Sequence, residues 1–423
     1  MKRNNLFVAC TIILSLLLVA ACAAPAPTAE VVEKVVTQVV EKEVQVVVTA
    51  APEEAAPIRI GVSLPLTGER AEPGTQSSRG YAVWAAMVNE AGGLLGRPVE
   101  IVQYDNASDA DTAVSDYERL VTVDEVDLLV GPFSSYLVFP SAAVAEKYGM
   151  VFPEPAGGAP EIFERCFQYL FFAQPAEGRR QADTFVDLVR SLPEDQQPKT
   201  IALPTVDDPF NRGVIDRARE LFTEAGYEIV YDEIFPQALT DFSPIAAKIK
   251  AANAEMLVAG TIFREAVELT RALQEVEYQP QAVFYTTAPS LPEFHEALGE
   301  ATEGIIAAVS WHTGFATFQN AEFVAKYAEM FNGEEPAEDA ANAFTVGQVL
   351  QQAVEQTKSI DNEVLKEFMH KATFNTVVGA LSFDQCGKPQ GFFHQLQWQG
   401  GNIEIVWPPS GATADLIWPK PGW

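Results

Sequence analysis

Short apolar runs alternate along the chain with longer stretches in which apolar residues recur every three or four positions. The run IRIGVSLPL at 58–66 is typical of a buried strand, and Ser78 is placed to cap a helix after it. Four residues would share one face of that helix: Tyr81, Trp84, Ala85 and Val88. Ala91-Gly92-Gly93 ends it, and the strand VEIVQYD follows at 99–105. Strand, helix and strand in succession predict a parallel sheet with crossover helices, the doubly wound α/β class.

The alternation restarts after residue 173 and predicts a second α/β lobe. Four apolar runs are typical of its strands: TIALPTV at 200–206, EIVYDEIF at 228–235, EMLVAGT at 255–261 and AVFYTT at 282–287. Helical patterns come later, near 320–331, 338–357 and 361–372. The segment HQLQWQGGNIEIVW predicts a hairpin that turns at Gly400-Gly401.

Residues 1–21 have the pattern of a secretory signal peptide. Lys2 and Arg3 precede an apolar run, and small residues lead to Cys22. This end resembles a bacterial lipobox, which implies cleavage before Cys22 and a lipid on that cysteine; ordinary cleavage beside an unrelated cysteine is the alternative. Residues 22–56, rich in Val and Glu, predict a lipid anchor and a flexible stalk. We therefore expect an extracytoplasmic protein, lipid-anchored to the cell membrane on its periplasmic or cell-surface face.

The length and charge narrow the class of protein. A chain of 423 residues exceeds one ordinary domain and suits two globular units. Its formal net charge of −30 argues against nucleic acid as a partner, because an acidic surface repels phosphate. Cys10 leaves with the signal peptide and Cys22 is acylated, so Cys166 and Cys386 remain. These two either form a disulfide or lie buried as thiols.

Motifs for catalysis and for metal binding are missing from the sequence. The segment GPFSSY places Tyr136 where a G-x-S-x-G nucleophile elbow needs its second glycine. DNASDAD at 105–111 resembles a calcium loop, but Ala107 takes a ligand position and Ala110 replaces the turn glycine. Four histidines stand outside any metal-binding spacing: His295, His312, His370 and His394. We therefore expect no enzyme, no metal and no cofactor.

Two strand ends predict a ligand clasp instead. The segment LLVGPFSSYL at 128–137 runs from a buried strand into a helix, with Ser134 and Ser135 between them. Helix-start amides together with hydroxyls suit a carboxylate. The second strand end, FPEPAGGAP, contains Gly157 and Gly158, whose amides can approach the same ligand group; a plain loop turn is the alternative. Ligands of doubly wound sheets bind beyond the carboxyl ends of strands, and both segments lie at such ends.

Seven segments, taken in order, carry a family resemblance over about residues 57–420: IRIGVSLPLTG, NEAGGLLGRPVEIVQYDNASDADTAV, LLVGPFSS, DPFNRGV, ANAFTVGQVLQQAVEQ, FNTVVGALSFDQCGKPQG and WPPSGATADLIWPKP. The chain resembles the solute-binding lipoproteins of ABC importers for branched-chain amino acids, amides and related acids, a periplasmic binding protein of type 1. The resemblance implies a monomer that traps a small molecule between two lobes and delivers it to ABC permease subunits.

The resemblance also implies a division of the chain. Two Rossmann-like lobes are joined by a three-segment hinge. The first lobe comprises 57–173 and 310–391, and the second comprises 174–309 and 392–423. Both remaining cysteines then fall in the first lobe near the hinge, which favours a disulfide between Cys166 and Cys386.

The family's ligand contacts transfer residue by residue. A serine after the G-P-x-S turn, here Ser135, holds the ligand carboxylate together with the loop from Ala156 to Gly158. Many members have Thr where this chain has Gly158, so only the amide remains there. In the second lobe, Phe210 stands where tyrosine is common, and the loop that contains Phe263 faces the cleft.

One departure from the family narrows the ligand. Amino-acid binders hold the ammonium with an acid on the loop after AVFYT, where this chain has Thr287. An α-ammonium would be poorly paired there, so an amide, a carboxylic acid or an aromatic acid suits the remaining donors better. At a hinge crossing, Trp311 and His312 can line the cleft. The alternatives are hinge packing for Trp311 and exposure to solvent for His312.

Two other functions compete with solute delivery. A ligand-sensing receptor domain of the same fold would carry a transmembrane helix and a signalling domain after the second lobe, and the sequence ends at Trp423 with neither. A hydrolase would need a nucleophile paired with a base, and no histidine has that context. Both are therefore ranked below an extracytoplasmic solute-binding protein.

Overall fold

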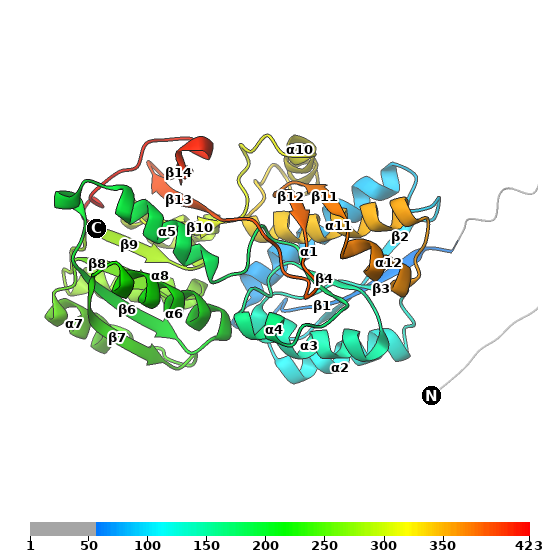
Figure 1. The fold of residues 1–423 in the computed structure, drawn as a ribbon, viewed down its shortest axis with the longest axis horizontal. Helices are drawn as coiled ribbons and strands as arrows, with labels where there is room; N and C mark the ends of the chain where they lie inside the picture. Colours follow the sequence, from blue (N-terminus) through cyan, green and yellow to red (C-terminus); the bar gives the residue numbers. More distant parts are fainter. Residues whose placement is uncertain (1–55) are drawn as a thin grey trace, which may run out of the picture. The chain divides into compact units, whose positions relative to one another are not determined.

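The computed structural model describes residues 56–423 (Figure 1). The predicted signal peptide, the predicted lipidation site Cys22 and all but the last residue of the predicted stalk lie outside the described residues. Among the helices of the described part, none is both long and apolar enough to cross a membrane.

The first half of the chain builds a parallel sheet covered on both faces. Strand order is β2-β1-β3, with β1 (Ile58–Leu64), β2 (Val99–Asp105) and β3 (Leu128–Leu129). A separate parallel pair is formed by β4 (Phe152–Glu154) and β5 (Leu170–Phe172). The connecting helices are α1 (Ala71–Glu90), α2 (Ala110–Thr122), α3 (Ser135–Tyr148) and α4 (Pro160–Glu164).

The start of α1 corrects one prediction. Ser78 lies inside this helix and does not cap it, because the helix begins at Ala71. Pro73 stands in the first turn, where the missing N–H costs no hydrogen bond, so the helix accommodates a residue that otherwise breaks helices.

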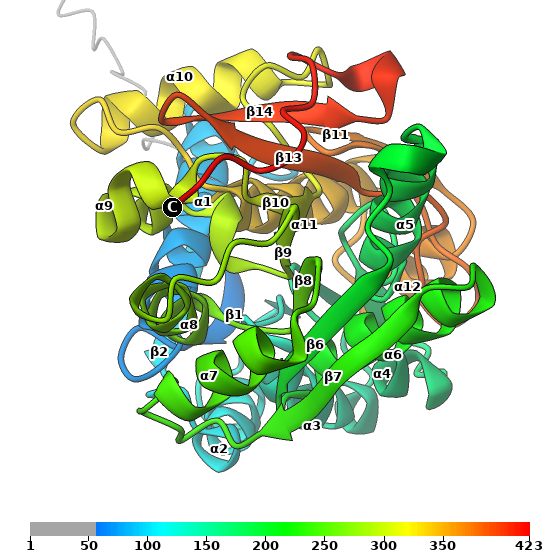
Figure 2. The same ribbon diagram turned by 90° about the vertical axis from the view of Figure 1, so that its left-hand side faces the viewer.

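The middle of the chain builds a seven-stranded sheet in the order β14-β13-β10-β9-β8-β6-β7. Its parallel strands are β6 (Thr200–Val206), β7 (Glu228–Phe235), β8 (Met256–Ala259), β9 (Ala282–Tyr285) and β10 (Ile306–Val309). An antiparallel edge is added by β13 (His394–Gln399) and β14 (Asn402–Trp407), visible in red in Figure 2. The predicted hairpin turn at Gly400-Gly401 is confirmed, and both glycines have positive φ.

Helices cover both faces of this sheet as well. They are α5 (Arg180–Ser191), α6 (Pro209–Glu224), α7 (Ser243–Ala252), α8 (Phe263–Glu275) and α9 (Pro292–Leu298). Short 3-10 turns complete the connections at Glu194–Gln196, Ala288–Ser290, Gly299–Thr302 and Pro409–Gly411.

After β10 the chain returns to the first sheet. It forms α10 (Asn320–Met330), α11 (Glu338–Thr357), α12 (Asn362–Met369) and the hairpin of β11 (Thr373–Thr376) and β12 (Gly379–Ser382). Helix α11 packs along α1 at very short range: a Cβ at Gly80 would lie 2.0 Å from the carbonyl oxygen of Ala340, and one at Gly347 would lie 2.3 Å from the Trp84 ring. Glycine at these two positions lets the two helices approach each other.

Two separate hydrophobic cores result, so the fold is an α/β protein of two lobes. One pair of buried clusters is drawn from residues 58–173 and 311–383, and the other pair from 176–309 and 393–406. The chain therefore passes three times between the cores. Cys166 and Cys386 form a disulfide with their Cα atoms 4.3 Å apart, which joins two distant segments of the first lobe.

Candidate functional site

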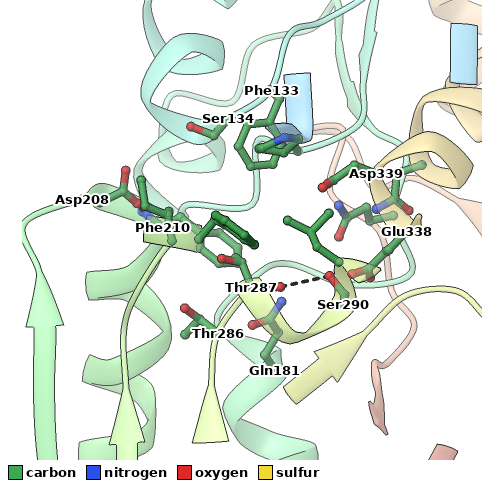
Figure 3. A pocket seen from close by; sticks show the side chains of 17 residues that line it. Phe133, Ser134, Gln181, Asp208, Phe210, Thr286, Thr287, Ser290, Glu338 and Asp339 are labelled. Atoms are coloured by element: carbon green, nitrogen blue, oxygen red, sulfur yellow. Dashed lines mark hydrogen bonds between the residues drawn. The ribbon is translucent and has the colours of Figure 1, made fainter. Parts of the chain in front are cut away.

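A cavity of about 60 Å³ lies where the two lobes face each other (Figure 3). Its lining comes from segments that follow β3, β4 and β5 in the first lobe and β6, β8 and β9 in the second, together with the beginnings of α1 and α11 and the first turn of α5. These are the carboxyl ends of parallel strands, where loops of α/β sheets leave room for a ligand.

The lining combines three kinds of side chain with the small Ala156. Apolar groups form part of the wall: Pro73, Phe133, Phe210, Ile262, Phe263 and Leu291. Neutral polar groups form another part: Ser134, Gln174, Gln181, Thr286, Thr287, Ser290 and Asn342. Three acids complete it, Asp208, Glu338 and Asp339, whereas no lysine or arginine within 56–423 lines this cavity.

The beginning of α3 stands beside the cavity, and its residue Ser134 lines it. Ser134 precedes the helix, and its carbonyl oxygen accepts the amides of Leu137 and Val138, each at 2.8 Å. The amides of Ser135 and Tyr136 have no acceptor within the described chain. The hydroxyl of Ser134 is also without a partner there, although the residue is only 8% exposed. A helix start with free N–H groups and a free hydroxyl suits a carboxylate or carbonyl oxygen.

Ser135 has a position that does not agree with its predicted role. It is fully buried; its hydroxyl donates to the carbonyl of Ala156 at 3.3 Å and accepts the amide of Ala159 at 3.1 Å. The serine that lines the cavity is its neighbour Ser134. Adjacent residues at a helix start point in different directions, so the assignment depends on where the helix begins, and the sequence pattern alone does not specify that residue.

The amides of the 154–158 loop serve the protein more than the cavity. Glu154 is fully buried, and one of its carboxylate oxygens accepts the amides of Ala156 and Gly157. Burial raises the pKa of Glu154 to about 8. Only Ala156 of this loop lines the cavity; Gly157 and Gly158, both predicted ligand contacts, do not.

Gly158 instead helps to seat an aromatic ring. A Cβ there would lie 3.1 Å from Cε2 of Phe210, and one at Gly178 would lie 2.4 Å from the same atom. Two glycines thus leave room for the Phe210 ring beside the cavity. A threonine at position 158, common in the family that the sequence resembles, would press on this ring.

Three predicted residues of the second lobe do come together at the cavity: Phe210, Phe263 and Thr287. Phe210 stands in the first turn of α6, which Asp208 caps by accepting the amides of Phe210 and Asn211. Thr287 donates its hydroxyl to the carbonyl of Thr261 at 3.0 Å. The pairing of β8 with β9 therefore fixes the loop that carries this threonine.

Trp311 does not reach the cavity. Its indole N–H donates to Oδ1 of Asn320 at 2.5 Å, and its ring packs edge-on against Phe323 in the first-lobe core. His312 lies beside it and its Nε2 is 3.1 Å from the carbonyl of Ile403. Both side chains therefore pack at the crossing between the lobes. For Trp311, this is the hinge packing that the sequence analysis gave as the alternative to lining the cleft.

Sequence reasoning missed the acids of the cavity. Asp208 has a partner, because Nη2 of Arg70 lies 3.6 Å from its carboxylate and both side chains are almost fully buried. Glu338 accepts hydrogen bonds from the amide and the hydroxyl of Ser310, and burial raises the pKa of its carboxyl. Burial also holds the pKa of Asp339 well above its usual range. In the sequence, these two acids have only the pattern of an ordinary helix start.

The described residues contain no cluster of three or more side chains that could hold a metal ion. The arrangement is that of a binding protein with a two-lobed α/β fold, in which a polar clasp and an acidic wall meet at one cavity.

Comparison with known proteins places this architecture in a family. A family model described as periplasmic binding protein matches residues 57–401, and the chain belongs to that family. A Leu/Ile/Val-binding protein homolog of Brucella melitensis is 25% identical over 388 residues, covering 88% of this chain and 96% of the relative.

Solved structures share the fold. The substrate-binding protein of a branched-chain amino acid transporter from Streptococcus pneumoniae, in complex with isoleucine, has a TM-score of 0.74 and 24% identity, covering 83% of this chain and all of that one. A solute-binding protein of an ABC transporter from R. palustris, in complex with benzoate, has a TM-score of 0.73 and 19% identity, covering 86% and 98%. At these identities the likeness extends to the fold alone.

Proposed function

We propose that this protein captures a small polar solute in the cavity between its lobes and delivers it to an ABC permease at the extracytoplasmic face of the membrane. The observation that carries the proposal is the beginning of α3. There, the amides of Ser135 and Tyr136 have no acceptor in the described chain, and the hydroxyl of Ser134, also without a partner there, lines a cavity formed by both lobes. The proposed lobes are 57–173 with 310–391, and 174–309 with 392–423.

Capture works by closure. A ligand held by α3 on one side and by Phe210, Phe263 and Thr287 on the other contacts both lobes at once, so it stabilises the closed arrangement over the open one. Polar contacts between the lobes support this: Arg70 donates to Oε1 of Gln237 at 2.8 Å, and Gln76 donates to Oε1 of Glu293 at 3.3 Å. No covalent step is needed, and the protein acts as a carrier without catalysis.

The related proteins support a small solute but differ in its chemistry. One solved relative holds isoleucine and another holds benzoate. We infer that this chain takes a molecule of similar size with at least one oxygen acceptor. That oxygen would bind the amides of Ser135 and Tyr136 and the hydroxyl of Ser134, here called the α3 clasp. Amino acids, amides and organic acids all have such an oxygen.

We further propose that cleavage before Cys22 and lipidation of that cysteine anchor a monomer to the membrane through the 22–56 stalk. Radiolabelled palmitate fed to cells that express the full chain should label the wild type, and a Cys22→Ala chain should stay unlabelled. Equal labelling of both chains would contradict the anchor.

Solute binding is tested by thermal unfolding of the full chain with and without amino acids, amides and aromatic acids at millimolar concentration. A bound solute stabilises the folded state by mass action, by about 2.7 kcal/mol when its concentration is a hundredfold above Kd, and it thereby raises the midpoint temperature. At least one probe should raise the midpoint in wild type. This rise of the midpoint should be smaller in Ser134→Ala. It should persist in the control variant Arg212→Met, because Arg212 pairs with Asp207 at the surface. A shift of equal size in Ser134→Ala would show that the solute does not bind at the beginning of α3.

A further inference from the structure

The beginning of α1 joins the two lobes at positions outside the cavity. Pro73 in its first turn lines the cavity, whereas Arg70 before it and Gln76 after it do not. Arg70 donates from Nη2 to Oε1 of Gln237 at 2.8 Å. Gln76 donates to Oε1 of Glu293 at 3.3 Å. Both acceptors belong to the second lobe, so these contacts hold the lobes together without occupying the space of a solute.

Arg70 is fixed by the first lobe. Its backbone amide donates to Oγ of Ser108 at 3.0 Å, and its carbonyl accepts the amide of Gly74 at 3.1 Å. Its guanidinium lies over the ring of Tyr136, 4.7 Å from the centroid, and Nη1 is 3.9 Å from the exposed carboxylate of Glu69. The first lobe therefore sets where this cation points, and separation of the lobes would break only its contacts with the second lobe.

The second lobe offers two acceptors to this cation. Gln237 is oriented by its own Nε2, which donates to the carbonyl of Asp207 at 2.7 Å, so that Oε1 faces Arg70. Asp208 caps α6 with Oδ1, and its other oxygen, Oδ2, lies 3.6 Å from Nη2 of Arg70. Both acceptors are placed by hydrogen bonds within the second lobe, so the cation meets an arrangement that is already formed.

Burial distinguishes this ion pair from one of comparable geometry elsewhere. The side chains of Arg70 and Asp208 are 3% and 4% exposed. Arg119 lies 4.8 Å from the ring centroid of Tyr104 and 3.7 Å from Asp124, but it is 58% exposed and both partners belong to the first lobe. Exposed pairs contribute little, whereas a buried carboxylate deprived of its cation is costly. Because separated lobes would return the charges of Arg70 and Asp208 to water, this pair bears on closure and the Arg119 pair does not.

We propose that Arg70 is a latch between the lobes: through Gln237 and Asp208 it keeps part of the ligand-free protein closed, and it thereby sets the affinity for any solute. This inference rests on the proposed solute-binding function, and it assigns affinity to a residue that does not line the cavity. The apparent dissociation constant equals the intrinsic constant divided by the closed fraction, so the closed fraction before binding scales every affinity.

The latch has a consequence that a ligand contact does not have. A side chain that touches the solute changes the affinities for different solutes unequally, because each solute presents different groups to it. A residue that shifts closure changes all affinities by one factor, which equals its effect on the closed fraction without solute. Arg70 therefore determines how tightly this protein binds and leaves the choice of solute to the cavity lining.

Pulsed electron paramagnetic resonance measures closure without any solute. Spin labels are placed on Val123→Cys in the first lobe and on Ile234→Cys in the second, at side chains that are 69% and 48% exposed. The full chain also carries Cys10→Ala and Cys22→Ala. The two introduced thiols are then the ones that react with the label, because the other two cysteines form a disulfide.

The labelled chain that retains Arg70 should show a population with the label separation of this structure. Arg70→Met should lower the ratio of this population to the rest about tenfold, because the carboxylate of Asp208 is then buried without a cation when the lobes close. Adding Asp208→Asn should restore much of it, since asparagine still caps α6 but has no charge. Gln237→Ala should act like Arg70→Met with a smaller effect, and it serves as the test if Arg70→Met does not fold. Arg119→Met is the matched control and should leave the populations unchanged.

Isoleucine and benzoate, which are bound in two solved relatives, test the link to affinity by calorimetry. Arg70→Met should weaken each probe that binds by the factor by which the closed population falls. Unequal losses would make Arg70 a ligand contact and overturn the latch. Unchanged label distances in both Arg70→Met and Gln237→Ala would also overturn it and leave the solute-binding function intact. A closed population that depends on Arg70, in a chain to which no molecule of the thermal screen binds, would support the latch and contradict solute binding.

Discussion

Two helices of the first lobe begin at the same cavity, α3 and α11, and they present opposite chemistry. The first turn of α3 has no acid, and the amides of Ser135 and Tyr136 and the hydroxyl of Ser134 have no partner among residues 56–423. The first turn of α11 has Glu338 and Asp339. Every helix N-terminus carries partial positive charge from unpaired N–H groups. At α3 that charge remains available to a ligand, whereas at α11 two carboxylates exceed it.

This difference shows that a helix start is not a binding site for anions in itself. Side chains of the first turn decide the sign of the potential that a ligand meets. Two helix starts with different first turns can therefore present different charge to one cavity. The following four predictions test this contrast, beginning with the largest expected effect.

Arg70→Met should have the largest effect, because it removes the cation beside Asp208. The contrast depends on Asp208 being compensated while the acids of α11 are not. Loss of one member of a buried ion pair leaves a buried charge without a partner, so the free energy of unfolding should fall by about 3 kcal/mol in urea denaturation. Arg212→Met removes a largely exposed pair with Asp207 and should cost less than about 1 kcal/mol. Similar losses in both variants would show that Asp208 needs no cation.

Glu154→Gln should change how stability depends on pH. The pKa of Glu154 is raised from 4.5 to about 8, so the folded state keeps a proton that the unfolded state releases. Its contribution is fully present below pH 4.5 and is lost as the pH rises through about 8. Wild type should lose stability over this window by at most about 1.4 kcal/mol per pH unit, and the glutamine variant should lose less.

This measurement concerns a buried acid that is hydrogen-bonded by the protein itself, in contrast to the two acids of α11 that line the cavity. Glu154 takes two backbone amides behind α3 and does not line the cavity. Its replacement should therefore leave the affinity for solute unchanged. Identical pH profiles for the two proteins, followed by thermal unfolding from pH 5 to 8.5, would contradict a raised pKa at this residue.

Ser134→Ala and Ser135→Ala should divide affinity from stability. Loss of the Ser134 hydroxyl should weaken the preferred solute by about 1–2 kcal/mol in calorimetry, because a ligand oxygen loses its partner. Loss of the Ser135 hydroxyl leaves the amide of Ala159 without an acceptor, which should lower the unfolding free energy by a similar amount while affinity changes little. The opposite result, with Ser135→Ala the weaker binder, would restore the role that the sequence predicted for Ser135.

Asp339→Asn without ligand should have the smallest effect, and its sign is informative. Burial and the neighbouring carboxylates raise the pKa of Asp339, so its charged form opposes folding as the pH rises through that raised pKa. The variant should be more stable than wild type at pH 8 by about 0.5–1 kcal/mol. A clear loss of stability would indicate that the carboxylate chiefly stabilises the helix start, and would weaken the contrast with α3.

Much of the fold was predictable from local patterns. The runs at 58–66 and 282–287 are apolar over strand length, and the structure has buried strands in both. The turn at Gly400-Gly401 was found as expected, because two adjacent glycines between alternating runs favour a hairpin. The helix start at Ala71 was missed, since the pattern around Ser78 resembles a cap and nothing local excludes a longer helix.

The site was predictable only in outline. Strand ends and helix starts identified the α3 segment, and Ser134, Ala156, Phe210, Phe263 and Thr287 line the cavity. The pattern did not distinguish Ser134 from Ser135, nor did it show that the amide of Gly157 is taken by Glu154. Each of these depends on contacts with a segment elsewhere in the chain.

The amino-acid sequence by itself determined the two α/β lobes, the position of the clasp at a strand end, and the acidic character of the chain, because periodicity and composition are properties of short segments. Only the tertiary structure decided which acids of a chain with net charge −30 line the cavity. Glu338 and Asp339 differ in no local way from other acids at helix starts. The close packing of α11 on α1 sets them at the cavity, where no lysine or arginine of residues 56–423 joins the lining. That placement depends on contacts between segments far apart in the sequence, which no local pattern contains.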